Sequence, residues 1–223
     1  MKTTLTEENY LKAIFHTANN KNEVTVKDLS IFLGVKMPTI NNMMKKFADK
    51  NWIIYESYKP IRITPIGKKE AALVVRKHRL TEMFLVHKMN FGWENVHEIA
   101  EQLEHVHSPA FFDKMDELLD FPKFDPHGEP IPDRDGNIIL QDLQKLSDGL
   151  VGDCYTFMSV TISDDEFLSY LNSKNLELGI KMSIEKIEKF DKSMVIKIND
   201  SQIETLSQIV CDKLLVKKIK GES

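Results

Sequence analysis

The N-terminal fold is decided by residues 25–65, which read TVKDLSIFLGVKMPTINNMMKKFADKNWIIYESYKPIRITP. Thr25 can cap a short helix whose apolar residues recur at helical spacing, and Gly34 suits the left-handed position that ends such a helix. Pro38 then stands where the first turn of a second helix tolerates proline. Beyond that helix, isoleucines alternate around a turn at residues 57–60, which predicts a short β-hairpin.

Another helix is expected ahead of this stretch, at residues 5–18, with Thr6 as its cap. Helix, short helix, turn, helix and hairpin is the order of a winged helix-turn-helix, which places the second helix of the pair in the major groove of DNA. Asparagine can pair with adenine edges, and lysine and arginine suit phosphates. The candidate DNA-binding residues are Pro38, Thr39, Asn41, Asn42, Lys45, Lys46, Lys59 and Arg62.

Charge is distributed unevenly along the chain. The formal net charge of -4 would by itself argue against a nucleic-acid partner. Residues 36–79, however, hold 11 basic and 3 acidic residues, whereas residues 80–135 hold 4 basic and 13 acidic ones. The basic segment coincides with the expected winged helix, which favours the DNA-binding interpretation.

Several classes of protein are disfavoured by the sequence. No apolar run approaches the roughly 20 residues of a membrane span, and the N-terminus lacks the apolar segment of a secretory signal. The two cysteines, Cys154 and Cys211, make neither a disulfide framework nor a cysteine-based zinc site. We therefore expect a cytoplasmic protein with reduced thiols.

The remainder of the chain predicts two further parts, so the fold class is mainly α with a small β-domain. Helices are expected at residues 66–89, 93–106 and 108–121, and proline and glycine punctuate residues 122–149. Short strand-like stretches with one helix between them follow and predict a small β-barrel. The expected domains are the winged helix at 1–65, a helical domain at 66–140, a linker at 141–149 and the barrel at 150–220.

One set of histidine and glutamate residues has the spacing of metal ligands. His97, Glu101, Glu104 and His105 have offsets of 0, 4, 7 and 8, which place them on one helical face. The preceding helix carries His78 and Glu82, again four residues apart. Imidazole and carboxylate groups are ligands of divalent metals, so these positions are candidate ligands.

The sequence does not match the enzyme motifs that use these residue types. The run from His97 to Glu101 misses the zinc-protease motif because Glu101 stands where a second histidine is needed. No serine, cysteine or lysine stands beside a base at a useful spacing, so the predicted metal is structural or regulatory and the protein is predicted not to be an enzyme. Two alternatives stay open: a winged-helix regulator of a small organic ligand, in which these groups are ion pairs, and a metalloenzyme on a helical core.

The motifs RKHRLTE (76–82), VHEIAEQLEHVHS (96–108) and HGEPIP (127–132), following a winged helix, resemble the diphtheria toxin repressor family. Its members are metal-dependent bacterial transcriptional regulators that sense iron or manganese. The resemblance covers essentially the whole chain and implies a C-terminal barrel of the FeoA type. It also implies a homodimer that binds double-stranded operator DNA.

The resemblance implies two metal ions per subunit. One site would use the positions of Asn9, Glu101, Glu104 and His105, where Asn9 replaces the family's methionine or carboxylate. The second would use His78, Glu82 and His97, completed from the barrel by Asp164, in place of Ser163, and by Glu166. The position of Glu101 is cysteine in the iron-sensing branch and glutamate in the manganese-sensing branch.

Oxygen-rich ligands without thiolate favour Mn²⁺, with Fe²⁺ as the alternative. The sequence therefore predicts a metal-activated, homodimeric repressor of metal-homeostasis genes. Neither a membrane nor a small organic substrate is expected as a partner.

Overall fold

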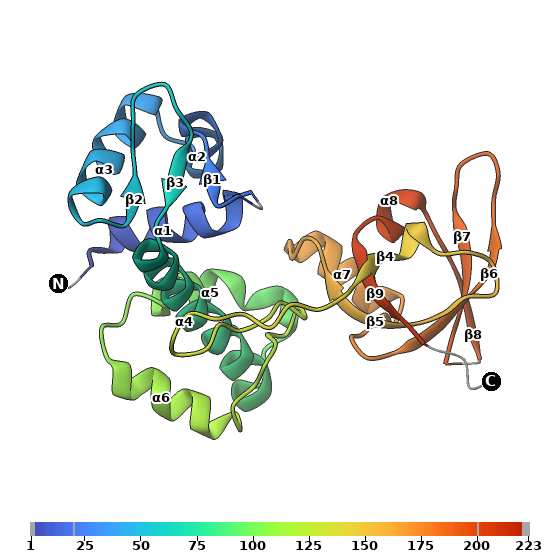
Figure 1. Ribbon diagram of the computed structural model, residues 1–223. Helices are drawn as coiled ribbons and strands as arrows, with labels where there is room; N and C mark the ends of the chain where they lie inside the picture. Colours follow the sequence, from blue (N-terminus) through green and yellow to red (C-terminus); the bar gives the residue numbers. More distant parts are fainter. Residues whose placement is uncertain (1–2, 20, 200, 220–223) are drawn as a thin grey trace. The chain divides into compact units, whose positions relative to one another are not determined.

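The computed structural model describes residues 3–19, 21–199 and 201–219, so the outermost residues of the expected terminal domains, Lys220 among them, lie outside the described residues (Figure 1). The chain forms two compact units. The first is built from residues up to 84 together with 98–123 and 131–139. The second is built from residues 85–97, 124–130 and 140 onward. Each unit is described by itself.

The first unit begins with the predicted helices of the winged helix-turn-helix. They are α1 (Leu5–Thr17), α2 (Val26–Leu33) and α3 (Met37–Asp49). Thr25 caps α2, Gly34 ends it in the left-handed conformation (φ 66°), and proline stands in the first turn of α3, all as expected. The expected cap of α1 at Thr6 is wrong. The Thr4 hydroxyl accepts from the Glu7 amide, and the Glu7 carboxylate accepts from the Thr4 amide, so the cap of this capping box stands two residues before the expected one.

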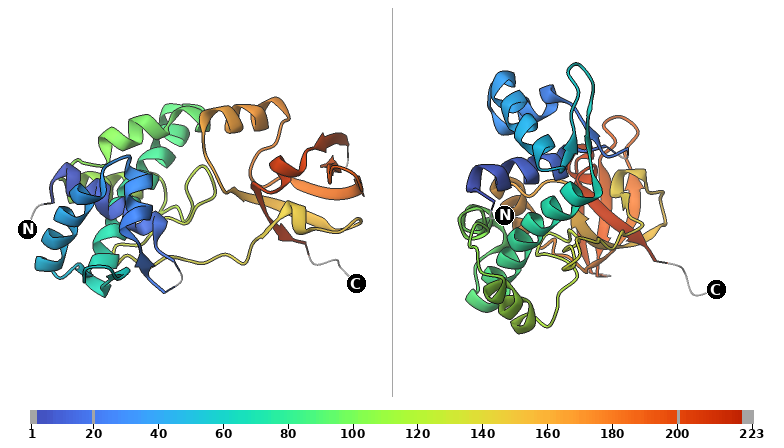
Figure 2. Two further views of the ribbon diagram at one scale, coloured as in Figure 1. Left: turned by 90° about the horizontal axis from the view of Figure 1, so that it is seen from above. Right: turned by 60° about the vertical axis from the view of Figure 1, so that its left-hand side comes forward.

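A small antiparallel sheet completes this winged helix. The predicted hairpin is present as β2 (Ile53–Ile54) and β3 (Ile61–Ile63), and a third strand, β1 (Glu23–Val24), pairs with the other side of β3. The loop that joins β2 to β3 is seen as a projecting wing in the right-hand view of Figure 2. Phe47 of α3 packs edge-on against Trp52, with ring centroids 5.0 Å apart, which anchors the hairpin to the helix.

The helices that follow are only partly as expected. The long α4 (Pro65–Met89) and α6 (Pro109–Leu118) are present, and Ser108 caps α6. The expected helix at 93–106 is wrong in extent, because a 3₁₀ turn, η1 (Trp93–Asn95), precedes a shorter α5 (His97–Leu103). In the second unit, Asn172 accepts from the Trp93 indole (2.7 Å) and donates to Glu94 (3.0 Å), and these bonds hold the 3₁₀ turn.

A buried ion pair ties α4 to α6 within the first unit. Arg76 lies 2.5 Å from Asp116, and the two side chains are 11% and 6% exposed. Arg76 also donates to the carbonyl of Pro132, so one guanidinium fastens the 131–139 segment as well. Leu80, Phe112, Met115 and Ile131 form the apolar core beside this pair.

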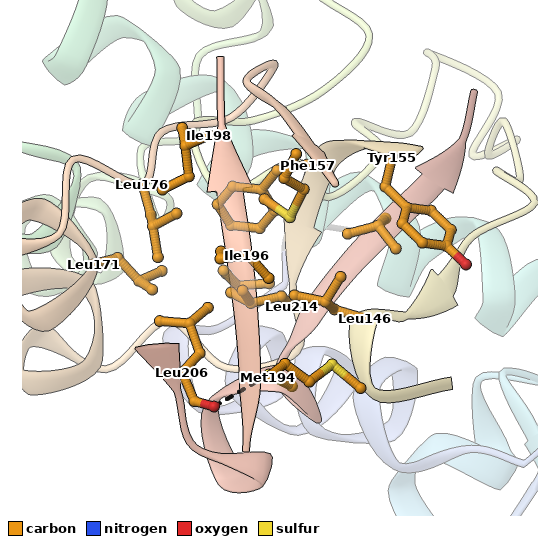
Figure 3. Packing of buried hydrophobic residues seen from close by; sticks show 14 of the residues in the cluster. Leu146, Tyr155, Phe157, Leu171, Leu176, Met194, Ile196, Ile198, Leu206 and Leu214 are labelled. Atoms are coloured by element: carbon orange, nitrogen blue, oxygen red, sulfur yellow. Dashed lines mark hydrogen bonds between the residues drawn. The ribbon is translucent and has the colours of Figure 1, made fainter. Parts of the chain in front are cut away.

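The second unit is dominated by an antiparallel sheet in the order β4-β9-β5-β6-β7-β8. Its strands are β4 (Gln144–Lys145), β5 (Cys154–Val160), β6 (Lys181–Ile187), β7 (Met194–Ile198), β8 (Gln202–Leu206) and β9 (Leu214–Lys218). The short η2 (Leu146–Asp148), α7 (Asp165–Ser173) and α8 (Gln208–Cys211) accompany it. Side chains from strands and helix form one apolar core, seen in Figure 3, which includes Phe157, Leu171 and Ile196.

The expected closed barrel is not confirmed. Within the described residues β4 and β8 are the edge strands and do not pair with each other, so the sheet is open. The register shifts between Phe157 and Ser159 on β5 and between Ile184 and Lys186 on β6, which bends the sheet without closing it.

The loop at 124–130 is fixed to β5 inside the second unit. The His127 carbonyl accepts from the Ser159 hydroxyl (2.9 Å), and the His127 ring bonds the carbonyl of Trp93. Gly128 has φ 84°, and a Cβ there would lie 2.0 Å from the Met158 carbonyl oxygen. Only glycine fits this close approach, which accounts for the His-Gly pair of the sequence motif.

No helix in the described ranges combines the length and the apolar character that crossing a membrane requires.

Candidate metal centre and nucleic-acid interface

Glu104 is the centre of a buried charged cluster in the first unit. It follows the last residue of α5 and is fully buried (0% exposed). The Lys12 ammonium of α1 lies 3.0 Å from Oε2 and 2.9 Å from Oε1, and the second contact lacks hydrogen-bond alignment. Burial opposes ionisation of Glu104, but hydrogen bonding from His78 and the charge of Lys12 outweigh it and lower the carboxyl pKa.

His78 joins α4 to this centre. Its Nδ1 lies 2.6 Å from Glu104, and its Nε2 lies 3.0 Å from Glu82 one turn along the same helix. Burial disfavours the imidazolium, but the hydrogen bonds to Glu104 and Glu82 prevail and raise the pKa of His78 to about 9. His78 is therefore a cation at neutral pH in this arrangement.

A second buried carboxylate, that of Glu8 on α1, forms hydrogen bonds with a histidine and a lysine side chain. It lies 2.7 Å from His105 Nδ1 and 2.9 Å from the Lys77 ammonium. Burial would raise its pKa, yet these hydrogen bonds lower it below the usual value. Through Glu8 and Lys12, α1 of the winged helix is bonded to α4 and to the turn that follows α5.

Six of the proposed ligands lie in the first unit, and five of them are linked by direct contacts or through Lys12, namely His78, Glu82, Glu101, Glu104 and His105. Glu101, in the last turn of α5, forms an ion pair with Lys12, which also contacts Glu104. His105 Nε2 lies 3.7 Å from Glu104 Oε1. Asn9 belongs to α1, and its buried Oδ1 accepts no hydrogen bond within the described residues. His78 and Glu82 complete the set from α4.

Three other proposed ligands belong to the second unit. His97 is exposed and begins α5. Asp164 caps α7, where its Oδ1 accepts from the Phe167 amide (2.8 Å), and Glu166 lies exposed in the first turn of that helix. Capping already occupies one oxygen of Asp164, which leaves the other for a ligand.

Sequence reasoning missed Glu8, Lys12 and Lys77 as members of the cluster. Glu8 and Lys12 are four residues apart on α1 and are both buried although charged. Their spacing was visible in the sequence, but a charged pair on one helix is ordinarily exposed. Their burial depends on partners from α4 and α5, which no local pattern shows.

The donor set suits a hard divalent cation. Carboxylates and imidazoles converge, and both Asn9 Oδ1 and Glu104 Oε1 are buried oxygens without a hydrogen-bond donor in the described residues. The Lys12 ammonium is the exception, because it contacts the same carboxylates that a metal would need.

The proposed DNA-binding residues lie on α3 and the hairpin. Pro38, Thr39, Asn42, Lys45, Lys46, Lys59 and Arg62 are exposed. Asn41 is half-buried, and its Oδ1 accepts from the Tyr55 hydroxyl (3.0 Å), which leaves its amide nitrogen and the second lone pair of Oδ1 available to a base. Lys59 pairs with Glu56 (2.5 Å), but the pair is exposed and so contributes little.

A winged helix bonded through its first helix to a buried cluster of carboxylates and imidazoles defines a DNA-binding transcription regulator. The family description "Iron dependent repressor, N-terminal DNA binding domain" matches residues 2–61, and "Iron dependent repressor, metal binding and dimerisation domain" matches residues 64–133. The chain belongs to this family of metal-dependent repressors, the diphtheria toxin repressor family.

Individual proteins that are similar to this chain are also transcriptional regulators, and two of them have structures with bound metal. The transcriptional regulator MntR of Bacillus pumilus is 29% identical over 119 residues, which are 53% of this chain and 82% of that protein. A structure titled as a manganese-dependent transcriptional repressor in complex with manganese is 28% identical, with a TM-score of 0.86 over 96% of this chain and all of that one. The structure of ScaR with bound Cd²⁺ is 29% identical, with a TM-score of 0.75 over 96% of this chain and 99% of that one.

Proposed function

We propose that this protein is a homodimeric repressor that binds operator DNA of metal-homeostasis genes when Mn²⁺, or alternatively Fe²⁺, is bound. The observation that carries the proposal is the buried cluster in which Glu104 and Glu8 join α1 of the winged helix to α4 and the end of α5. A cation bound there acts on the element that orients the DNA-binding helix.

The proposed division of labour follows the sequence. Residues 1–65 bind DNA, 66–140 bind metal and dimerise, 141–149 link, and 150–220 form a domain of the FeoA type built on the six-stranded sheet. The dimerisation role is supported by the description of the family model over residues 64–133.

The proposed ligands form two sites per subunit. Asn9, Glu101, Glu104 and His105 hold the first, and His78, Glu82 and His97 hold the second, with Asp164 and Glu166 from the sheet domain. A bound ion supplies two positive charges to the carboxylates. Mn²⁺ is favoured because oxygen ligands predominate and thiolate is lacking, and the names of the MntR and manganese-bound relatives support it.

Metal acts on DNA binding through orientation. The two recognition helices of a dimer must meet half-sites about 34 Å apart, so a fixed position of α1 against the middle helices favours one spacing. Glu8 and Lys12 supply contacts of α1 to these helices, and a ligand that binds this arrangement more tightly shifts the population toward it.

Titration with metal tests the proposal. DNA fragments from the gene's own upstream region are incubated with the purified protein, and retention is measured as Mn²⁺ or Fe²⁺ is added anaerobically. We expect retention to require metal and to reverse with a chelator. DNA retention that is the same with and without metal contradicts the proposal.

Glu101 is expected to set metal preference. Because a thiolate is softer than a carboxylate, Glu101→Cys should move the half-maximal response away from Mn²⁺ and toward Fe²⁺ and Zn²⁺, by about tenfold in relative terms. Glu98→Cys on the exposed side of α5 is the matched control and should leave the ranking unchanged. The same ranking of the three metals in Glu101→Cys and wild type contradicts this role.

A further inference from the structure

Lys12 is a partly buried lysine on α1 whose ammonium group lies against carboxylates of the proposed metal site. It lies one turn after Glu8 on α1, and its side chain is only 11% exposed. Its ammonium contacts Glu101 and both carboxylate oxygens of Glu104, which is fully buried. Lysine is among the residues least often buried, and its burial here is accounted for by these two carboxylates.

An ammonium and a divalent ion need the same oxygens. Lysine is a compact point charge with three donors, and here those donors point at carboxylates proposed to hold the first metal. A divalent ion held by Glu101 and Glu104 would take carboxylate lone pairs that now face the Lys12 ammonium, and it would place two further positive charges beside that cation. The two cations are therefore alternatives at this position.

The charge around the cluster agrees with this interpretation. Four carboxylates, those of Glu8, Glu82, Glu101 and Glu104, face the ammonium groups of Lys12 and Lys77 and the imidazole rings of His78 and His105. Like charges in a buried site repel strongly, so a divalent ion gains most once the Lys12 charge has left.

We propose that Lys12 is a tethered competitor of the first metal: its ammonium occupies the Glu101 and Glu104 carboxylates in the metal-free protein, and metal binding displaces it. The inference rests on the proposed function, because it assigns a role at the same site. Lys12 thereby sets the metal concentration at which the protein responds, and it keeps the buried carboxylate of Glu104 paired until that concentration is reached.

The test compares Lys12→Met with wild type. Free Mn²⁺ is measured directly by its electron paramagnetic resonance signal as the apoprotein is titrated. With the competing charge removed, the Mn²⁺ affinity should rise about tenfold or more, as expected for a close buried charge pair. In the absence of metal, Lys12→Met should also melt at a lower temperature, because Glu104 is left buried without its ammonium partner.

Three further variants keep the test decisive. Lys12→Gln serves if the methionine variant does not fold, since it also lacks the charge. Lys12→Arg keeps the charge and should retain affinity close to wild type. Lys50→Met is the matched control, because Lys50 pairs with Glu7 on α1 and is likewise partly buried, and neither member of that pair is a proposed ligand. It should leave Mn²⁺ affinity unchanged.

The outcomes separate the inference from the function. Wild type that binds Mn²⁺ with the same affinity as Lys12→Met and Lys12→Gln overturns the inference and leaves the proposed function standing. Wild type that binds no Mn²⁺ beside an uncharged variant that does supports the inference and contradicts metal dependence of the native chain. Absence of Mn²⁺ binding in wild type and in every variant overturns both.

Discussion

His105→Ala is expected to abolish metal-activated DNA binding while the protein remains folded. His105 is the imidazole proposed for the first metal site, and it also bonds Glu8 of α1 at 2.7 Å. Changes to residues that only orient ligands weaken metal binding about 10–100-fold, so loss of a ligand should exceed about 100-fold. At metal concentrations that saturate wild type, the variant should retain no more DNA than the metal-free protein.

The neighbouring histidine provides the control. His107 is 39% exposed in its side chain, and its Nδ1 lies 4.0 Å from Glu8, beyond hydrogen-bonding range. His107→Ala should therefore respond to metal as wild type does. Circular dichroism and melting temperature establish that both variants are folded. A response of His105→Ala at the wild-type metal concentration would remove His105 from the site.

Local signals predicted the winged helix well because its boundaries are set locally. Thr25 and Gly34 flank α2 with a capping box and a left-handed C-cap, both of which are readable from residue type alone. The predicted cap of α1 is wrong because two threonines, Thr4 and Thr6, precede acidic residues. Only Thr4 has glutamate three residues later, which makes the reciprocal pair possible.

The candidate site was predictable in part. Periodicity singled out Glu101, Glu104 and His105, and the structure brings them to one cluster, although Glu104 and His105 lie in the turn after α5 and not on a continuous helix. Lys12 and Glu8 could not be found in the same way. Their importance comes from ion pairs that span more than 60 residues of sequence, to Lys77, Glu101 and beyond.

The C-terminal unit shows a different limit. The strand-like stretches led to a predicted closed barrel, and that closure is not confirmed, because it would need β4 to pair with β8, which are the edge strands of the described sheet. Residues 182–198 form one continuous strand-like stretch in the sequence. In the structure this stretch is divided into two paired strands, β6 and β7, with Ile184 opposite Ile196. Pairing partners are set by packing of both faces, so period alone leaves them open.

Affinity for operator DNA is expected to fall steeply with salt, by about 10³–10⁵ between 50 and 200 mM if six to ten phosphates are contacted. Lys45 and Lys46 are exposed on α3, and Arg62 is exposed on β3. With Lys59 at the wing, each protomer offers four cations, and a dimer offers twice that number. Each neutralised phosphate releases counterions, with a slope of about -0.9 in the log–log plot.

Single substitutions measure how much each lysine contributes to the salt dependence of DNA binding. Lys46→Gln should weaken binding to all sequences alike and reduce the slope by about one for each phosphate that is no longer neutralised, hence by about two in a dimer. Lys186→Gln is the control, since Lys186 is an exposed lysine paired with Glu188 on the sheet unit and carries the same charge change. Binding is measured by fluorescence anisotropy over a salt series with metal held saturating. If Lys46→Gln and Lys186→Gln change the slope equally, only a general effect of net charge remains. That result would mean that α3 does not face the phosphates.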